Sequence, residues 1–471
     1  MSIIVYNSLS RKKEEFNPIQ PKKVGMYSCG PTVYNVPHIG NYRAYLCDDT
    51  IARILQYNGF DVNHVMNITD VDDKTIKNAN AAGLSLTEFT SHYTQQFLED
   101  LADLNISTIT YHPKATLHIS EMIDLISLLL NNGSAYKGDD GSIYFSIKSF
   151  PSYGNLARLD RQELQADASG RMKNDEYSKE SVRDFALWKA WSEEDGDVFW
   201  DAAFGKGRPG WHIECSAMSM KYLGSHFDIH AGGVDLLFPH HENEIAQSES
   251  ATGIPFVNYW LHNEWLLVNG SKMAKSAGNF ITYRDIIGKG YDPLAYRFLC
   301  LQTHYRQQLN FSYDVLDAAQ QGYRNLQNDI QNIANSAAEH SGVLSTHQVG
   351  SLIEHTQYKF KEAVNDDFNT PKGLAVVFEF LKHIHQHEMN FTSPDFQLCL
   401  NAIYDFDMVL GLGLDTIKHI ELPENVSALV RERDSARASR NFIRSDELRT
   451  TIESQGYSIE DTSDGSRISK I

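Results

Sequence analysis

The chain has 471 residues, of which 42% are apolar and 22% are charged. This length exceeds a usual single domain of about 100–200 residues, so it predicts several domains with a sizeable buried core and excludes a disulfide miniprotein. The composition is that of an ordinary globular protein, which excludes a fibrous protein and a disordered chain. The formal net charge of −19 argues against a protein that coats DNA or an anionic membrane, while leaving open a local nucleic-acid site.

The first seventy residues predict a β-α-β unit. Residues 23–29 suit a short buried strand, residues 38–58 form a long amphipathic stretch, and residues 61–68 suit a second strand. Such a unit has parallel strands and a right-handed crossover, so the pattern indicates an α/β protein with a Rossmann-like sheet. Ligands bind beyond the carboxyl ends of the strands of such sheets, which places a site near residues 29–32 and 68–70.

The rest of the chain predicts an insertion, a helical bundle and a small terminal module. Helix-rich and polar stretches follow residue 104, and the apolar strand pattern resumes only near residue 227, so we expect the nucleotide fold to be split. Farther on, long helical patterns dominate, for example over 313–337, and an Arg-rich segment covers 431–449. The predicted domains are the first half of a Rossmann-like catalytic domain (1–104), a connective insertion (105–189), the second half of the catalytic domain with a lysine loop (190–291), the helical bundle (292–422) and the C-terminal module (423–471).

Five cysteines are spread widely along the chain, at Cys29, Cys47, Cys215, Cys300 and Cys399. Their odd number and wide spacing predict reduced thiols in a cytoplasmic protein rather than a disulfide framework, and they leave metal binding open. The N-terminus lacks the apolar stretch of a signal peptide, and acidic residues interrupt the most apolar helix candidate, 119–130. We therefore expect no association with a membrane.

A phosphate site is predicted at the start of the first long helix, where residues 37–41 are Pro-His-Ile-Gly-Asn. Free backbone N–H groups and the helix dipole favour phosphate there. His38 would add a donor, Gly40 would let an adenine or ribose approach the backbone, and Asn41 would supply a second polar contact. Taken alone the string is weak evidence, because a histidine near a helix start is more often an ordinary cap or a surface group.

A second basic string, Gly-Ser-Lys-Met-Ala-Lys-Ser over residues 270–276, places Lys272 and Lys275 three residues apart in a loop. Two ammonium groups in such a loop can neutralise the charge that builds on an α-phosphate and on leaving pyrophosphate. The alternative is a solvated basic loop.

A metal site is indicated by His240 and Glu244, which lie four residues apart on a predicted helix and so share one face. Two cysteines would complete a tetrahedral set of zinc ligands, and the residues alone leave open which two of the five these are. Cys47 and Cys300 lie in apolar helices and suit a core better. His241, the neighbour of His240, is the alternative histidine.

The two basic strings together resemble the paired signatures of class I aminoacyl-tRNA synthetases, in a HIGH-like form at 38–41 and a KMSKS-like form at 272–276. From about residue 4 to the C-terminus, the chain resembles the cysteinyl-tRNA synthetases. The strings that carry this resemblance are Tyr-Ser-Cys-Gly-Pro-Thr-Val-Tyr (27–34), Asn-Ile-Thr-Asp-Val-Asp-Asp-Lys (67–74), Gly-Trp-His-Ile-Glu-Cys-Ser (210–216), Phe-Pro-His-His-Glu-Asn-Glu (238–244) and Asp-Asp-Phe-Asn-Thr-Pro (366–371).

The resemblance implies an enzyme that activates L-cysteine with ATP to cysteinyl-adenylate and transfers the cysteinyl group to the 3′-terminal adenosine of tRNA(Cys). It implies Mg²⁺ with the ATP and one zinc ion per subunit that selects the substrate thiol. Zinc suits this task because apolar contacts alone separate such small side chains by roughly 1–3 kcal/mol, whereas the metal binds a thiolate directly. The expected partners are the tRNA, ATP and cysteine, with no DNA and no membrane, and we expect a monomer.

The resemblance also assigns roles to particular residues. The implied residues are Cys29, Cys215, His240 and Glu244 for zinc; Gly30, Thr32, Thr69, Trp211 and His230 for the substrate; His38, Gly40, Asn41, Asp235 and Lys275 for ATP; and His38, Asn41, Lys272 and Lys275 for catalysis.

The sequence departs from the family pattern at two places. Ala274 takes the place of the usual serine in the lysine loop, which removes a hydroxyl but neither lysine, so we expect activity to persist. Residues 464–468 lack the tryptophan that many relatives carry there, so a stacking platform for an anticodon base is expected to be absent or relocated. Two rival functions stay open: a related cysteine ligase with an amino-sugar acceptor, and a catalytically silent RNA-binding paralogue.

Overall fold

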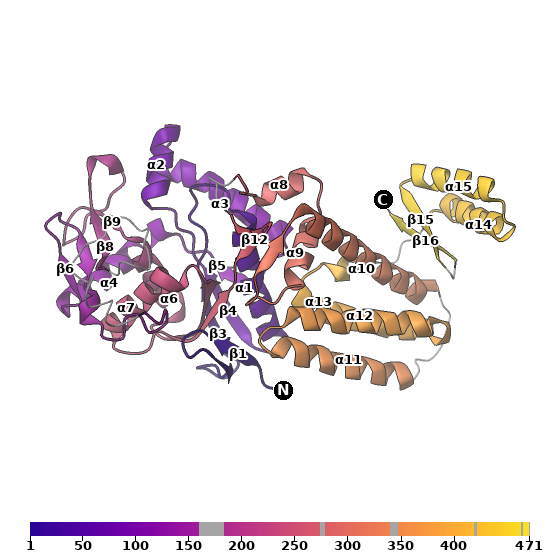
Figure 1. Cartoon of the computed structure of the whole chain (residues 1–471), viewed down its shortest axis with the longest axis horizontal. Helices are drawn as coiled ribbons and strands as arrows, with labels where there is room; N and C mark the ends of the chain where they lie inside the picture. Colours follow the sequence, from indigo (N-terminus) through magenta and orange to yellow (C-terminus); the bar gives the residue numbers. More distant parts are fainter. Residues whose placement is uncertain (160–182, 274–277, 340–346, 419–421, 463–464, 471) are drawn as a thin grey trace. The chain divides into compact units, whose positions relative to one another are not determined.

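The computed structural model describes residues 1–159, 183–273, 278–339, 347–418, 422–462 and 465–470. The chain divides into two compact units, which are both drawn in Figure 1. Unit 1 comprises Met1–Leu316 and Glu362–Pro371, and unit 2 comprises Asp317–Lys361 and Lys372–Ile471. The chain therefore passes between the two units three times.

A five-stranded parallel sheet forms the centre of unit 1, in the strand order β11-β10-β3-β4-β5. Its strands are β3 (Lys23–Ser28), β4 (Asp61–Met66), β5 (Ile109–Tyr111), β10 (Phe227–Gly233) and β11 (Val257–Asn263). Inner strands of a parallel sheet are covered on both faces, which explains the unbroken burial of residues 227–232 in β10. The predicted Rossmann-like α/β fold is confirmed.

Helix α1 (Ile39–Tyr57) connects β3 to β4 and packs against β4 and β10. His38 is its N-cap and Asn58 its C-cap, and Gly59 follows with a left-handed φ of 84°. Glycine adopts this conformation without a steric penalty, so it ends the helix where the sequence predicted.

The parallel sheet is interrupted in the sequence between β5 and β10, which confirms a split nucleotide fold. The intervening segment contains a four-stranded antiparallel sheet in the order β6-β7-β8-β9. Its elements are α4 (Ile119–Asn131), β6 (Ala135–Lys137), β7 (Ile143–Phe145), β8 (Phe185–Ala190), β9 (Gly207–Pro209) and α6 (Trp211–Leu223). Buried apolar side chains of these elements join those of β3 and β4 in one cluster, so the insertion shares the core of the sheet. The polar residues 160–182 lie outside the described residues.

Smaller elements complete unit 1. They are β1 (Ile4–Asn7), β2 (Lys12–Glu15), α2 (Asp73–Ala82), α3 (Leu86–Asp103), a π-helical turn (Leu237–His241), α7 (Glu242–Thr252), β12 (Leu266–Val268), β13 (Ser271–Lys272), α8 (Tyr283–Gly288), α9 (Pro293–Leu301) and β14 (Leu309–Phe311).

Unit 2 is mainly helical, as predicted for the C-terminal region. Its elements are α10 (Tyr313–Glu339), α11 (His347–Asn365), α12 (Thr370–His387), α13 (Ser393–Leu410), α14 (Glu424–Ala438), α15 (Phe442–Ser454), β15 (Tyr457–Thr462) and β16 (Gly465–Lys470), of which the first three begin or end in unit 1. Val426, Ile452 and Ile459 form a separate small core among the last elements. Among the described residues, none of the helices combines the length and the apolar character needed to cross a membrane.

A short segment between α11 and α12, Glu362–Pro371, belongs to unit 1 rather than to the helices that flank it. Asp367, which is fully buried, accepts hydrogen bonds from the Tyr6 N–H at 2.9 Å, the Tyr305 hydroxyl at 2.8 Å and Nε of Arg306 at 2.8 Å. Its own N–H donates to the Ile4 carbonyl at 2.9 Å. One carboxylate thus joins three distant stretches of the chain within unit 1.

Candidate active site

A cavity of about 540 Å³ opens at the carboxyl ends of β3, β4 and β10, the position that parallel α/β sheets favour for ligands. The predicted site residues that line it are Cys29, Gly30, Thr32, His38, Gly40, Asn41, Thr69, Trp211, Cys215, Asp235, His240 and Lys272. His230 and Glu244 do not line it and are fully buried. Lys275 lies outside the described residues.

The start of α1 is held by a reciprocal cap between His38 and Asn41. The Asn41 N–H donates to Nδ1 of His38 at 3.1 Å, and the His38 N–H donates to Oδ1 of Asn41 at 3.1 Å. Burial lowers the pKa of His38, so near pH 7 the ring is neutral and carries its proton on Nε2. The cap uses Nδ1 and leaves Nε2–H for a ligand, so capping is compatible with the phosphate role, which stays a prediction.

Gly30 lies directly against the end of β4. A Cβ at this position would lie 1.7 Å from the Asn67 carbonyl oxygen, so only glycine fits. The Gly30 N–H donates to Oδ1 of Asn67 at 2.9 Å, and Nδ2 of Asn67 donates to the Thr69 hydroxyl at 3.1 Å. That hydroxyl in turn donates to Oε2 of Glu214 at 2.9 Å. Thr32 pairs with Thr69 in a single parallel bridge, so three predicted substrate contacts are held in one network.

Four potential metal ligands converge beside the cavity: Cys29 after β3, Cys215 on α6, His240 in the π-helical turn and Glu244 at the start of α7. Their ligand atoms all lie within 4.8 Å of one another. Sγ of Cys29 is 3.9 Å from Sγ of Cys215 and 4.0 Å from Oε1 of Glu244. Nε2 of His240 lies 3.1 Å from the same carboxylate oxygen, yet it is buried and makes no hydrogen bond. The structure thus brings together the four residues that the family resemblance implied.

Charges within this cluster stabilise one another. Burial opposes ionisation of Cys215, but hydrogen bonding to Cys29 and the charge of His240 lower its pKa to about 6. Burial likewise opposes ionisation of Glu244, but His230 and His240 lower its pKa to about 2. The Cys215 and Glu244 charges outweigh burial at His240 and raise its pKa to about 10. Burial and then hydrogen bonding to Cys215 raise the pKa of Cys29, so the cluster holds protons that a metal would displace.

A second donor set shares Cys29 and Glu244 with the first and adds His230 and His241. Nε2 of His241 lies 3.6 Å from Sγ of Cys29, and its Nδ1 forms a 2.9 Å hydrogen bond with Nε2 of His262. Nε2 of His230 forms a 3.0 Å hydrogen bond with Oε2 of Glu244. The π-helical turn therefore presents both adjacent histidines to the cluster, which a regular helix would not do.

Trp211 and Asp235 line the cavity from two further elements. Trp211 is the first residue of α6, and its ring packs on His240 with centroids 4.3 Å apart. Asp235 follows the Gly232–Gly233 pair at the end of β10, where a Cβ at residue 233 would lie 2.4 Å from Oδ1 of Asp235. Glycine thus lets the acid approach the strand end, where it faces the cavity.

Of the two lysines in the second basic string, only Lys272 lies among the described residues. It is exposed on β13, and its Nζ lies 3.1 Å from the ring centroid of Trp265. Ala274 and Lys275 fall outside the described residues, so the part predicted for them stays a prediction.

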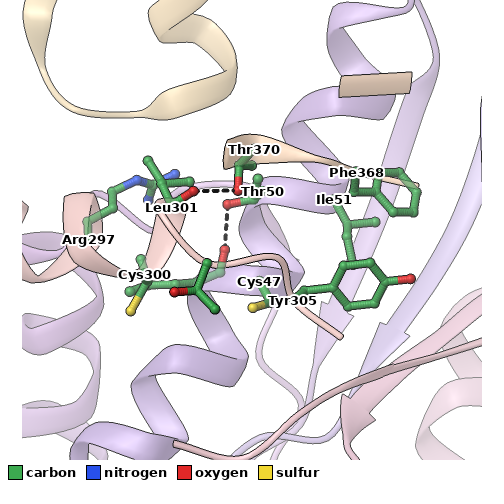
Figure 2. Close-up of a pocket in the computed structure, with 11 residues that line it drawn as sticks. Cys47, Thr50, Ile51, Arg297, Cys300, Leu301, Tyr305, Phe368 and Thr370 are labelled. Atoms are coloured by element: carbon green, nitrogen blue, oxygen red, sulfur yellow. Dashed lines mark hydrogen bonds between the residues drawn. The ribbon is translucent and has the colours of Figure 1, made fainter. Parts of the chain in front are cut away.

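A second cavity of unit 1, of only about 20 Å³, lies between α1 and α9 and is shown in Figure 2. Cys47 and Cys300 line it, and the Thr370 hydroxyl closes one side by donating to the Leu301 carbonyl at 2.8 Å. This volume suits about one water molecule, so the cavity is too small for a substrate. Burial raises the pKa of Cys47 to about 12 and that of Cys300 to about 11, which fits the core role that the sequence suggested.

Three buried side chains that carry no predicted role support the site: Asn67, Glu214 and Arg43. Nη1 of Arg43, on α1, donates to the Glu264 carbonyl at 2.6 Å and to the Trp265 carbonyl at 2.7 Å. The one available signal was proximity, because each of the three lies within two residues of a position that was singled out. Apart from Thr69, which lies two residues from Asn67, their hydrogen-bond partners are far away in the sequence, so no local pattern predicts these hydrogen bonds.

Comparisons with known proteins agree with this geometry. Residues 15–321 match the family model described as tRNA synthetases class I (C) catalytic domain, and residues 359–415 match the DALR domain. The curated cysteine–tRNA ligase of Brachyspira hyodysenteriae (strain ATCC 49526 / WA1) is 47% identical over 467 residues, covering 98% of this chain and 98% of that protein. The cysteine–tRNA ligase of Protochlamydia amoebophila (strain UWE25) is 45% identical, covering 99% of this chain and 97% of that protein.

A solved structure shares the fold at low sequence identity. Methionyl-tRNA synthetase of Mycobacterium tuberculosis, in complex with methionyl-adenylate, superposes with a TM-score of 0.63 at 15% identity, covering 84% of this chain and 93% of that one. At this identity the likeness concerns the fold alone.

Proposed function

The chain belongs to the cysteine–tRNA ligases, a family of class I aminoacyl-tRNA synthetases, and from this premise we propose which of its residues carry the reaction. The enzyme activates L-cysteine with ATP and joins it to tRNA. One observation supports the assignment above all others: the thiols of Cys29 and Cys215 line the same cavity as the capped start of α1. A sulfur-binding cluster and a phosphate-binding helix end are the two things that cysteinyl-adenylate formation needs in one place.

The ATP half of the site is assigned to the start of α1 and to the lysine loop. The helix N-terminus and Nε2–H of His38 would hold the phosphates, and Asp235 would hold the ribose. Asn41 uses its Oδ1 in the cap, so its Nδ2 would face the nucleotide. Attack of the cysteine carboxylate on the α-phosphate needs positioning and charge neutralisation more than a protein base, so Lys272 and Lys275, with Mg²⁺ on the ATP, would neutralise the phosphates.

The donor atoms at Cys29, Cys215, His240 and Glu244 fit a zinc ion. This set offers two sulfur ligands, which zinc prefers, whereas the overlapping set with His241 offers one. The His240 ring is oriented by a 2.8 Å hydrogen bond between its Nδ1 and Nδ1 of His212, which leaves Nε2, 3.1 Å from Oε1 of Glu244, as the ligand atom. When bound, the ion would supply a Lewis-acidic centre that prefers the substrate thiolate to a hydroxyl or a methyl group.

The chain's own residues would shape the cysteine pocket around that centre. Trp211 forms an aromatic wall, and Gly30 and Thr69 are fixed by the Asn67 network described above. Gly30 and the threonines would contact the ammonium and carboxylate of the amino acid. His230 is fully buried and hydrogen-bonded to Glu244, which favours a role in orienting that carboxylate behind the pocket wall.

Unit 2 is assigned to tRNA binding, because the DALR match lies largely within it and its last helices carry several arginines. Two of these arginines are already paired with acids: Arg431 with Glu424 at 2.7 Å, and Arg444 with Glu432 at 2.7 Å. We therefore expect only a modest electrostatic contribution from this segment. We also propose a cytoplasmic monomer, and a mass twice that of the chain in light scattering would refute the monomer.

Cysteine-dependent ATP–pyrophosphate exchange, measured without tRNA and beside serine, tests this function. Exchange with cysteine and none with serine is the expected result, because the thiol cluster should reject the hydroxyl. Zinc should co-purify with the active protein, as measured by elemental analysis. Equal exchange with serine would refute selection by the thiol cluster, and zinc-loaded, folded protein without any exchange would refute the assigned ATP site.

A further inference from the structure

A two-residue turn fixes the position of Lys272 relative to Trp265. Strands β12 and β13 pair in an antiparallel hairpin, with Leu267 opposite Lys272, around the turn Asn269–Gly270. Both turn residues have positive φ, 50° and 77°, as an Asn-Gly hairpin turn requires. Trp265 lies two residues before Leu267 and so shares its face, which makes it a diagonal neighbour of Lys272 across the hairpin. The register therefore places the lysine against the indole.

The contact itself is a cation–π interaction. Nζ of Lys272 lies 3.1 Å from the centroid of the Trp265 ring, well inside the distance at which an ammonium is attracted to an aromatic face. Within the described part of the chain, the Lys272 ammonium forms no ion pair. Both side chains line the 540 Å³ cavity that also contains His38 and Asp235. The indole thus holds the positive charge at the wall of the nucleotide cavity.

Hydrogen bonds to its carbonyl fix the backbone of Trp265. Its carbonyl accepts Nη1 of Arg43 at 2.7 Å and the Leu309 N–H at 3.1 Å. Arg43 is only 1% exposed and belongs to α1, the helix whose cap is His38. Helix α1 therefore carries His38 at its start and also fixes the backbone of Trp265 through Arg43. The proposed phosphate site and the contact between Trp265 and Lys272 thus depend on the same helix.

We propose that Trp265 is a positioning residue that holds the Lys272 ammonium in the nucleotide cavity before ATP arrives. The proposal rests on the role assigned above to Lys272. A lysine side chain has many rotamers, and a partner that keeps its charge inside the cavity lowers the entropy lost when phosphate binds. Trp265 would act through Lys272 alone.

A double-mutant cycle in pyrophosphate exchange tests this dependence. Trp265→Leu should lower kcat/KM for ATP by roughly threefold to tenfold, the effect of losing a partly desolvated cation–π contact, while Trp265→Phe should restore most of it. In a Lys272→Met background, Trp265→Leu should have no further effect, because the residue through which it acts is gone. A similar loss in both backgrounds would show a merely structural role and overturn the proposal. Melting temperatures of all variants control for folding.

Fluorescence of the ATP-free protein tests the contact independently of catalysis. The emission of Trp265 is obtained as the difference between the wild type and Trp265→Phe, and the same difference is measured in the Lys272→Met background. We expect the two difference spectra to differ, because an ammonium 3.1 Å from an indole perturbs its emission. Identical spectra would overturn the proposal.

Lys206→Met is the matched control. Lys206 also lies over aromatic rings, 3.8 Å from the centroid of Trp191 and 3.5 Å from that of Phe199, but it does not line the cavity. This variant should leave both the Trp265 difference spectrum and the exchange activity unchanged, and a change in that difference spectrum would count against the proposal.

The experiments distinguish a failure of the role assigned to Lys272 from a failure of the role proposed for Trp265. If Lys272→Met alters the Trp265 spectrum but not the exchange rate, the role assigned to Lys272 is wrong and Trp265 positions nothing that matters for catalysis. If it lowers the rate without altering the spectrum, the role of Lys272 stands and that of Trp265 falls.

Discussion

In unit 2 the buried side chains are mainly apolar, as where Phe360 and Phe406 meet with ring centroids 4.6 Å apart, whereas unit 1 buries charged groups throughout its fold. Arg297 and Asp49 of unit 1, for example, form a 2.7 Å ion pair with both side chains fully buried. Burying a charge is unfavourable unless it is paired and hydrogen-bonded.

The buried acids of unit 2 have a more local role. Asp407 accepts the N–H groups of Leu412 and Leu414 at 2.7 and 2.8 Å, and so ends its own helix. Arg297 in unit 1 instead donates to the carbonyls of Leu104 and Asn105 and to Asp49, which lie far away in the sequence. Arg297 and Asp49 thus fix distant segments of unit 1, whereas the buried carboxylate of Asp407 in unit 2 fixes the end of its own helix.

Removing a thiol should affect activity and zinc content very differently in the two units, and this is the largest effect that we expect. Cys215→Ala should lower cysteine-dependent exchange by more than about 100-fold and abolish stoichiometric zinc, because even residues that only support metal ligands matter 10- to 100-fold. Cys399→Ala, which removes a buried thiol from α13 of unit 2, is the control and should keep both zinc and exchange. A zinc-loaded, active Cys215→Ala protein would contradict the assigned ligand set.

Breaking the buried ion pair should have the largest effect on stability. Among the described residues, Arg297→Met leaves Asp49 paired with Arg53, and it should lower the free energy of unfolding by about 3 kcal/mol in urea titrations. In unit 2 the Arg431–Glu424 pair is exposed, so Arg431→Met should change the unfolding free energy by less than about 0.5 kcal/mol. Equal effects of the two substitutions would remove the contrast between the units.

Buried histidine should make the stability of unit 1 depend on pH. His64 is fully buried between the Ser28 hydroxyl at 2.8 Å and the Thr108 hydroxyl at 3.1 Å, and burial lowers its pKa to about 4. In the unfolded chain His64 binds a proton below about pH 6.5, whereas in the folded protein it stays neutral until the pH falls to about 4. The contribution of neutral His64 to the free energy of unfolding is therefore fully present above pH 6.5 and is lost as the pH falls from 6.5 to 4.

His64→Gln removes this titration. The wild type should lose about 2 kcal/mol more than the variant between pH 7.5 and pH 5, as measured by urea unfolding at both values. His355→Gln, at an exposed position on α11, should behave as the wild type does. A wild-type loss equal to that of His64→Gln would show that this histidine is not protected from protons.

The smallest effect is expected from reshaping the apolar core of unit 2. Phe406→Leu keeps an apolar side chain of similar volume and should lower the unfolding free energy by about 1 kcal/mol, with exchange activity unchanged. Tyr358→Leu, on the exposed side of α11, should change it by less than about 0.5 kcal/mol. A loss of exchange activity in Phe406→Leu would show that unit 2 also supports the adenylate step.

The sequence was informative wherever local pattern decides structure. The strand over 23–29, the helix over 38–58 and the long helix from residue 313 follow from apolar periodicity and glycine positions, and the structure contains all three. The capping role of His38 was a stated alternative, and the structure contains it at the predicted phosphate site.

The sequence was silent where contacts between distant residues decide. Thr69 and Glu214 are joined by a hydrogen bond across 145 positions, and the Arg43 side chain reaches carbonyls more than 220 positions away. That both His240 and His241 face the cluster also depends on a π-helical turn that periodicity does not predict. Supporting hydrogen bonds of this kind depend on the packed arrangement of segments, which no local pattern encodes.

The segment Glu362–Pro371 has a consequence for how this protein is made. During synthesis, residues 1–316 leave the ribosome first, yet unit 1 lacks the carboxylate of Asp367 until residue 371 has also emerged. At about 5–20 residues per second, that delay lasts several seconds. During that time Tyr6, Tyr305 and Arg306 lack their shared hydrogen-bond acceptor, Asp367. The catalytic unit can therefore complete its fold only after most of α10 and α11 has been translated.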